Sequence, residues 1–258
     1  MDLLKGKVAL ITGSRQGLGR TVAELFLGEG AHVAINGRNK VEVEAAVSDL
    51  KSQGYANVMA APGNVARQLE CFAMCRSVIK EWGKIDVLVN NATDSALSAS
   101  EDLDCEDWER VLGVNLSGSF YCSQAAAKLS MIEQRSGSII MISSILGLGG
   151  SKQRAAYCSA KHGMIGLSKA LAVEWGVFNI RVNALCPSNI MTPLEKEDAE
   201  TGRCGYTIQD IERRTPLGRY STPLEQAKAC LWLASQDSSF TTGSVINTDG
   251  GWSAYMGI

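Results

Sequence analysis

Short apolar runs alternate with longer segments of helical spacing along all 258 residues, and this alternation constrains the fold more than any other feature. The runs are 4–8 residues long and rich in Val, Ile, Leu and Ala, which is typical of buried strands. Seven strands are predicted, at 7–12, 32–36, 57–61, 86–90, 138–142, 180–186 and 244–248.

The segments between the runs are predicted to be helices. In 65–82, apolar residues recur at steps of three, four and seven, which would place them on one helix face: Val65, Leu69, Phe72, Ile79 and Trp82. Leu224, Ala227, Leu231 and Ala234 repeat the pattern. Strands alternating with helices predict right-handed βαβ units, and hence an α/β fold: a Rossmann-like, doubly wound parallel sheet of about seven strands with helices on both faces. No internal repeat or Pro/Ser-rich linker divides residues 1–258, so a single domain is expected.

One stretch interrupts the alternation. Residues 192–222 are polar, hold several glycines and two prolines, and connect the sixth strand to the helix around Leu224. A connection of that length is typical of a substrate lid, although a solvated excursion would have the same composition.

Composition excludes several functional classes. Twenty-five basic and 27 acidic side chains give a net charge of −2, so nothing favours nucleic acid or an anionic membrane as a partner. No apolar stretch reaches the ~20 residues of a membrane helix, and the N-terminus lacks a signal-peptide core. The eight cysteines form no CxxC pair and only two histidines are present, so no metal site is expected. Reduced, mostly buried thiols in a cytoplasmic protein fit this pattern.

A glycine-rich turn follows the first predicted strand. In the order of the chain it contains Gly13, Arg15, Gln16, Gly17, Leu18 and Gly19. Glycines here let the backbone turn tightly and approach a pyrophosphate, which the N–H groups of the next helix can bind. A purely structural turn is the alternative.

The end of the second predicted strand bears on cofactor choice. A carboxylate at this point would bind both ribose hydroxyls and repel a 2′-phosphate, but the sequence has Asn36-Gly37-Arg38-Asn39. Arg38 offers a bidentate guanidinium, and Arg15 can reach the same phosphate, so NADP(H) is favoured and NAD(H) is the alternative. Arg38 could also be a solvated turn residue.

Tyr157 and Lys161 are candidate reacting groups. Their spacing of four residues in a helical segment places both side chains on one face. A phenol ordinarily titrates near pH ~10, and a nearby ammonium would lower that pKa toward the range useful for proton transfer. Taken alone, the pair is common on helix surfaces.

Several motifs together resemble the short-chain dehydrogenase/reductase family. They are Thr12-Gly-x3-Gly-x-Gly19, Asn90-Asn91-Ala92, Asn115, Ser144, Tyr157-x3-Lys161, Pro187-x2-Ile190-x-Thr192 and Asp249-Gly250-Gly251. They span nearly the whole chain in the family's order. The resemblance is strongest to its sugar-acid and polyol branch, which includes gluconate 5-dehydrogenase.

The resemblance implies roles for four catalytic residues. Tyr157 would be the general acid/base, and Lys161 would lower its pKa and hold the nicotinamide ribose. Ser144 would orient the substrate oxygen, with Ser143 as the neighbouring alternative. Asn115 would hold a water of the proton relay, or would be a helix-interior residue bonded only to backbone.

The resemblance also implies a cofactor envelope. Its members beyond the glycine turn and Arg38 are Asn64, Val65, Asn91, Ala92, Pro187, Ile190 and Thr192, together with Tyr157 and Lys161. Three positions depart from the family pattern: Thr93 and Ser188 stand where glycine is usual, and Asn64 replaces an aspartate. Thr93 and Ser188 add bulk near the cofactor, but no reacting group is lost.

The implied activity is reversible hydride transfer between a nicotinamide and a hydroxyl or carbonyl carbon, without a metal, in a homotetramer. A sugar acid, polyol or small hydroxyketone is the expected substrate, since Arg154, Arg203, Arg213 and Arg214 lie where a carboxylate could be held. Reduction of a 3-oxoacyl thioester on an acyl carrier protein is the alternative. A nucleotide-binding protein without catalysis is a further one.

Overall fold

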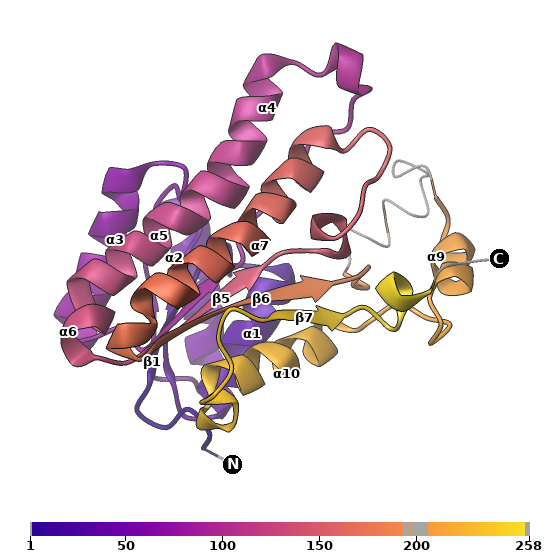
Figure 1. Ribbon diagram of the computed structural model, residues 1–258. Helices are drawn as coiled ribbons and strands as arrows, with labels where there is room; N and C mark the ends of the chain where they lie inside the picture. The colour runs from indigo at the N-terminus through magenta and orange to yellow at the C-terminus, as the bar shows by residue number, and fades with distance from the viewer. Residues whose placement is uncertain (1, 193–196, 198–205, 256–258) are drawn as a thin grey trace.

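The computed structural model describes residues 2–192, 197 and 206–255. These residues form seven strands in one parallel sheet (Figure 1). The strands are β1 (Val8–Ile11), β2 (His32–Ile35), β3 (Val58–Ala60), β4 (Val87–Asn90), β5 (Gly137–Ile142), β6 (Ile180–Pro187) and β7 (Val245–Thr248). Their order is β3-β2-β1-β4-β5-β6-β7, so the chain reverses direction across the sheet between β1 and β4. The predicted α/β fold and all seven strands are confirmed.

Helices cover both faces of the sheet (Figure 1). They are α1 (Gly17–Gly28), α2 (Lys40–Ser52), α3 (Gln68–Trp82), α4 (Cys105–Leu112), α5 (Gly118–Ala126), α6 (Ile132–Gln134), α7 (Ala155–Trp175), α9 (Ile208–Arg214) and α10 (Pro223–Ala234). Short 3₁₀ segments are η1 (Ser100–Asp102), η4 (Ile145–Gly147), η5 (Gly176–Phe178), η6 (Gln236–Ser238) and η7 (Trp252–Ala254). Together with the strands they give the alternation that the sequence predicts.

The strands divide their side chains between two apolar cores, as period-two alternation requires. Leu10 of β1 joins the core beneath α3, α5 and α7, whereas Ala9 and Ile11 join the core beneath α1, α2 and α10. Because both faces of every central strand are covered, the runs are continuously apolar rather than alternating.

The predicted buried face of the 65–82 segment is partly wrong. Helix α3 begins at Gln68, so Val65 precedes it, and Leu69 is 82% exposed. The buried face of α3 consists of Cys71, Met74, Cys75 and Val78. These residues have the same helical spacing and face α5. Two overlapping apolar patterns run through residues 65–82, and contact with α5 determines that the pattern containing Cys71, Met74 and Cys75 is the buried one.

A single long helical run carries one predicted site residue. Helices α4, α5 and α6 follow each other without a break, joined by the π turns η2 (Gly113–Ser117) and η3 (Ala127–Met131). A π turn adds one residue to a helical turn and is frequent at functional sites. Asn115 lies within η2.

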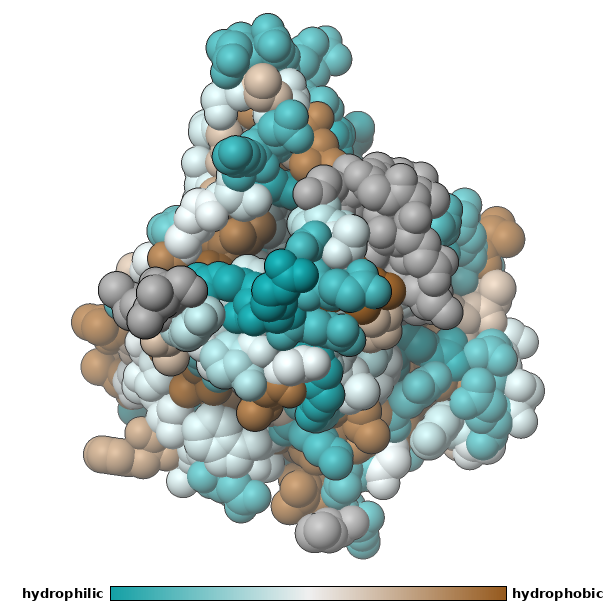
Figure 2. Space-filling view, turned by 90° about the vertical axis from the view of Figure 1, so that its right-hand side faces the viewer, coloured by the Kyte–Doolittle hydropathy of each residue, from teal (hydrophilic) through white to brown (hydrophobic). Residues whose placement is uncertain are grey.

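The predicted lid is described only in part. Residues 193–196 and 198–205, with Arg203, lie outside the described residues. Helix α9 begins with a capping box, in which Thr207 and Asp210 exchange side-chain to backbone hydrogen bonds. It lies on the side toward which β6 and β7 point, and hydrophilic side chains gather in the middle of that face (Figures 1 and 2). In the described part of the chain, every helix is too short or too polar to cross a membrane.

Candidate active site

The glycine turn between β1 and α1 needs glycine for two reasons. Gly13 and Gly17 have φ of +62° and +59°, a region that other residues rarely adopt. A Cβ on Gly13 would also lie 2.8 Å from the Cα of Ala92, and one on Gly19 would lie 2.5 Å from the Nδ2 of Asn91. The turn is therefore pressed against the segment that follows β4, as a phosphate-binding turn at the reversal point of the sheet should be.

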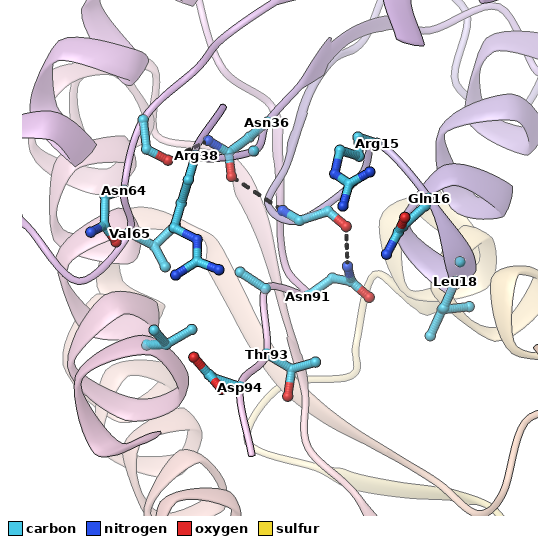
Figure 3. Close-up of a pocket in the computed structure, with 16 residues that line it drawn as sticks. Arg15, Gln16, Leu18, Asn36, Arg38, Asn64, Val65, Asn91, Thr93 and Asp94 are labelled. Carbon is cyan, nitrogen blue, oxygen red and sulfur yellow. Dashed lines mark hydrogen bonds between the residues drawn. The ribbon is translucent and has the colours of Figure 1, made fainter. Parts of the chain in front are cut away.

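Two asparagine side chains hold this turn in place (Figure 3). The Nδ2 of Asn91 donates to the carbonyl oxygens of Thr12 (2.9 Å) and Gly13 (3.0 Å). The Oδ1 of Asn36 accepts from the N–H of Gly13 at 3.1 Å. Sequence reasoning missed this role of Asn36, which it placed at the ribose. An amide one residue past the buried strand was the available signal.

A cavity of about 350 Å³ opens beside the turn. Most predicted cofactor residues line it: Gly13, Arg15, Gln16, Gly17, Leu18, Arg38, Asn64, Val65, Asn91 and Ala92. Gly19 lies beneath the turn against Asn91. Pro187 ends β6, and Ile190 and Thr192 follow it with Ile190 bridged to Ser221. Glycines that admit a close backbone approach, followed by the free N–H groups at the start of α1, fit a dinucleotide phosphate.

Two arginines, Arg15 and Arg38, line the cavity (Figure 3) and differ in their ion-pair partners. Arg15 forms an ion pair with Glu42, with Nε and Oε2 2.9 Å apart. Arg38 is exposed, and no carboxylate in the described part of the chain pairs with it. Arg38 is therefore the arginine whose charge is available to an incoming anion.

Asn64 makes hydrogen bonds that its position in the sequence does not predict. Its Oδ1, the acceptor expected to face the adenine, accepts from the N–H of Ala66 at 3.1 Å, and its own N–H donates to Glu70 at 2.7 Å. The residue thus shapes the loop ahead of α3 as well as lining the cavity.

The predicted reacting side chains come together where β5 and α7 meet. Tyr157 lies in the first turn of α7, and the Nζ of Lys161 is 5.4 Å from the centre of its ring. Ser144 follows β5, its Oγ accepts from the N–H of Leu146, and it lowers the pKa of Tyr157 as a hydrogen-bond partner. Ser143 instead donates to the carbonyl of Lys161 at 2.9 Å and is buried. Of the two serines, Ser144 is the one at the phenol.

Burial dominates the electrostatics of this pair. It lowers the pKa of Lys161 from 10.5 to about 7, and the buried Nζ donates to the carbonyl of Ile142 at 2.8 Å. Burial also raises the pKa of Tyr157, while hydrogen bonds from Ser144 and Thr93 and the charge of Arg154 lower it. The sequence predicts a phenol made acidic by Lys161; the structure differs, because burial of both groups weakens the charge of the lysine.

Asn115 is fully buried and bonded on both sides of its amide. Its Nδ2 donates to the carbonyls of Asp94 and Val111, each at 2.8 Å, and its Oδ1 accepts from the hydroxyl of Thr93 at 2.8 Å. The partner Thr93 is one of the three departures noted in the sequence.

The arginines predicted to lie near a substrate make different contacts. Arg214 stacks on Trp252 and Tyr255. Arg154 is half-buried at the start of α7, and its guanidinium donates to the Oγ of Ser95 at 2.7 Å. The carboxylate of Asp94, the residue before Ser95, is paired with Arg110.

Comparisons with known proteins agree with this geometry. A family model described as enoyl-(acyl carrier protein) reductase matches residues 13–253. A 3-oxoacyl-[acyl-carrier-protein] reductase of Chlamydia muridarum is 40% identical over 250 residues, or 97% of this chain and 98% of that protein. D-threitol dehydrogenase of Mycolicibacterium smegmatis is 35% identical over 249 residues, or 96% and 94% of the two chains.

A solved structure is also closely similar. Gluconate 5-dehydrogenase from Burkholderia cenocepacia, in complex with NADP and tartrate, has a TM-score of 0.92 at 30% identity, over 98% of this chain and 97% of that one. The family model, the relatives and the solved structure all cover nearly the full length of the chain. This chain belongs to the short-chain dehydrogenase/reductase family and is an oxidoreductase.

Proposed function

We propose that the protein is an NADP(H)-dependent enzyme that interconverts a hydroxyl and a carbonyl group on a sugar acid, polyol or small hydroxyketone. The observation that carries this proposal is the surroundings of Tyr157: the Nζ of Lys161 lies 5.4 Å from the centre of its ring, and Ser144 lowers its pKa as a hydrogen-bond partner. The nicotinamide, when bound, gives or takes the hydride.

The chain's own residues move and hold the proton. In the oxidation direction, ionised Tyr157 accepts the hydroxyl proton of the substrate, and in reduction it returns that proton to the new alkoxide. Ser144 has its lone pair engaged by the N–H of Leu146, so its hydroxyl proton is free to donate to the substrate oxygen. Lys161, Pro187, Ile190 and Thr192 would hold the nicotinamide end, and Asn115 would position the relay.

Tyr157→Phe tests the catalytic assignment. Loss of the hydroxyl should reduce turnover by at least ~100-fold, the usual contribution of a general acid/base, while NADPH binding measured by fluorescence stays within twofold. A Phe variant that turns over at the parent rate would refute the assignment. Loss of NADPH binding in the same variant would place the tyrosine in the cofactor site only.

The NADP(H) preference rests on Arg38. Its exposed, unpaired guanidinium lines the cavity, and no carboxylate stands at the end of β2 to repel a phosphate. Arg38→Ala should raise the KM for NADPH about 10- to 100-fold, as loss of a charge-assisted hydrogen bond does, and leave the KM for NADH unchanged. Lys40→Ala removes the same charge two residues away, outside the cavity lining, and serves as the control. Equal loss for both coenzymes would contradict the assignment.

The substrate class rests on Arg154. This half-buried cation lies one turn before Tyr157 and its charge acts on the phenol, so it can hold a carboxylate close to the reacting carbon. In an absorbance screen, Arg154→Gln should lower kcat/KM for hydroxy acids at least tenfold and spare uncharged polyols. An equal effect on both would contradict carboxylate binding.

Reduction of a 3-oxoacyl thioester is the second candidate. It is favoured by the 40% identity to a 3-oxoacyl-[acyl-carrier-protein] reductase over almost the whole chain. Acetoacetyl thioesters belong in the same screen. Faster turnover of these than of any hydroxy acid or polyol would decide for the second candidate.

A homotetramer in the cytoplasm completes the proposal. Family membership supports the assembly, and so do large apolar side chains left in solvent, such as Val173 on α7 and Phe240 ahead of β7. The described cysteines are free and mostly buried, which suits a reducing compartment. Sedimentation equilibrium should give four times 27.6 kDa; a monomer would contradict the assembly.

A further inference from the structure

Ser143 carries a buried hydroxyl that the proposed reaction does not use. The residue follows the end of β5, precedes Ser144 and is only 3% exposed. Its N–H donates to the carbonyls of Met141 at 3.0 Å and Leu185 at 2.8 Å, so its backbone is fixed to β6. Its Oγ donates to the backbone carbonyl of Lys161 at 2.9 Å. Ser143 therefore links the end of the sheet to α7.

Two consecutive residues of the chain hold the two ends of Lys161. The carbonyl of Ile142 accepts from the Nζ at 2.8 Å, and the hydroxyl of Ser143 donates to the backbone carbonyl. The ammonium of a lysine lies at the end of a flexible four-carbon stem, so a bond to the ammonium alone does not fix the helix turn behind it. With both ends held, the whole residue is fixed against the end of β5.

The bond from Ser143 is additional to those that form the helix. In an α-helix the carbonyl of Lys161 accepts from the N–H of Ile165, four residues further on. A carbonyl oxygen has a second lone pair, and this one receives the hydroxyl of Ser143. Removing the hydroxyl therefore leaves the helical bonds of α7 complete and breaks only its link to β5.

Gly147 closes this link off from the other side. It is buried in η4, and a Cβ on it would collide with the Oγ of Ser143 and lie 2.9 Å from the carbonyl oxygen of Lys161. The backbone of η4 thus packs directly against the bond. Because Ser143 and Lys161 are both almost fully buried, solvent competes little for this hydrogen bond, and the bond is stronger than it would be at a surface.

We propose that Ser143 is a positioning residue that fixes the turn of α7 carrying Tyr157 and Lys161. Its hydroxyl ties this turn to the strand end that continues into Ser144, so the three reacting side chains keep their places relative to one another. The 5.4 Å between the Nζ of Lys161 and the ring of Tyr157 depends on this link. Ser143 acts through Lys161 rather than on the substrate. The inference rests on the proposed acid/base role of Tyr157.

Ser143→Ala tests the inference by removing the hydroxyl alone. With NADPH and the fastest substrate of the screen above, kcat should fall about tenfold, because the reacting groups lose their exact placement. The KM for that substrate should stay within twofold of the parent value, because no binding group is removed. By hydrogen-exchange mass spectrometry, backbone amides of residues 157–165 should exchange at least ~5-fold faster than in the parent, since this turn is no longer tied to β5.

Ser138→Ala is the matched control. Ser138 lies near the opposite end of β5, is also 3% exposed, and its Oγ donates to the carbonyl of Leu233 on α10 at 2.8 Å. The control therefore loses the same kind of bond between the same strand and a different helix. Both variants should lose a similar amount of melting temperature. Only Ser143→Ala should turn over slowly and exchange faster at residues 157–165.

Three results would overturn the inference. One is a parent-like kcat in Ser143→Ala. Another is an equal loss of kcat in Ser138→Ala, which would make the effect one of general stability. The third is a slow Ser143→Ala variant with parent-like exchange at residues 157–165, because the hydroxyl would then act on the reaction directly. If Tyr157→Phe is inactive and Ser143→Ala is unaffected, only the role of Ser143 fails. If Tyr157→Phe is active, the proposed function itself fails.

Discussion

Lys161 should make the folded protein less stable than it would be with an apolar residue at the same position. Burial lowers its pKa from 10.5 to about 7, so folding removes a proton that the unfolded chain holds throughout this range. Because the unfolded state binds more protons, the free energy of unfolding rises with pH between these values. The cost of burying this amine is about 4 kcal/mol at pH 7 and about 1 kcal/mol at pH 10.

Lys161→Met removes this cost at similar side-chain volume. It also leaves the carbonyl of Ile142 without its 2.8 Å donor, which costs about 1–2 kcal/mol. The variant should therefore be about 2–3 kcal/mol more stable than the parent at pH 7, and catalytically inactive. Its advantage should fall by about 1.4 kcal/mol per pH unit as the pH rises toward 10.

Urea unfolding from pH 7 to 10 measures this difference. Other titrating groups are common to both proteins and cancel in the comparison. Lys169→Met, at an exposed position of the same helix, is the matched control and should follow the parent at every pH. A Lys161→Met variant whose stability differs from the parent by a constant amount across this range would refute the argument that burial suppresses the charge.

Two further predictions follow from the glycine turn. Gly13→Ala and Gly17→Ala should both carry the strain of positive φ, about 1–2 kcal/mol. Only at Gly13 would the added Cβ meet backbone atoms. The Gly13→Ala variant should therefore have a much lower melting temperature and a much weaker affinity for NADPH than the Gly17→Ala variant. Asn36→Asp should not convert the enzyme to NADH. The Nδ2 of Asn36 faces the carbonyls of Ala61 and Gly63, where a carboxylate oxygen would be repelled, so we expect a lower melting temperature and an unchanged NADH-to-NADPH ratio of kcat/KM.

The sequence predicts the framework well because the framework has a simple cause. Strands buried on both faces must be continuously apolar, so the seven runs are visible, and each observed strand lies within about one residue of its predicted range. The helix at 68–82 shows where this reasoning stops. Leu69 belongs to one apolar pattern and Cys71 to another, and only the position of α5 decides which is buried.

Within the site, residue identities were predictable and partners were not. Tyr157 and Lys161 were predicted from their spacing, and Ser144 and Asn115 from the family resemblance. That Asn36 bonds the glycine turn, or that Thr93 bonds Asn115, depends on which segments distant in the sequence the fold brings together. Periodicity along one segment contains no information on such contacts.

Burial explains why the electrostatics of the site differ from expectation. A lysine can make a phenol acidic only if it keeps its charge, and burial at Lys161 works against that charge. Hydroxyls carry no charge to lose, so their effect on Tyr157 survives burial and grows stronger in a low-dielectric site. At this site, the neutral donors Ser144 and Thr93 can therefore stabilise the phenolate where the amine alone does so least. A Ser144→Ala/Thr93→Val double variant should therefore raise the pH at which oxidation reaches half its maximum by more than either substitution alone, and a double variant that matches Thr93→Val would show that Ser144 does not stabilise the phenolate.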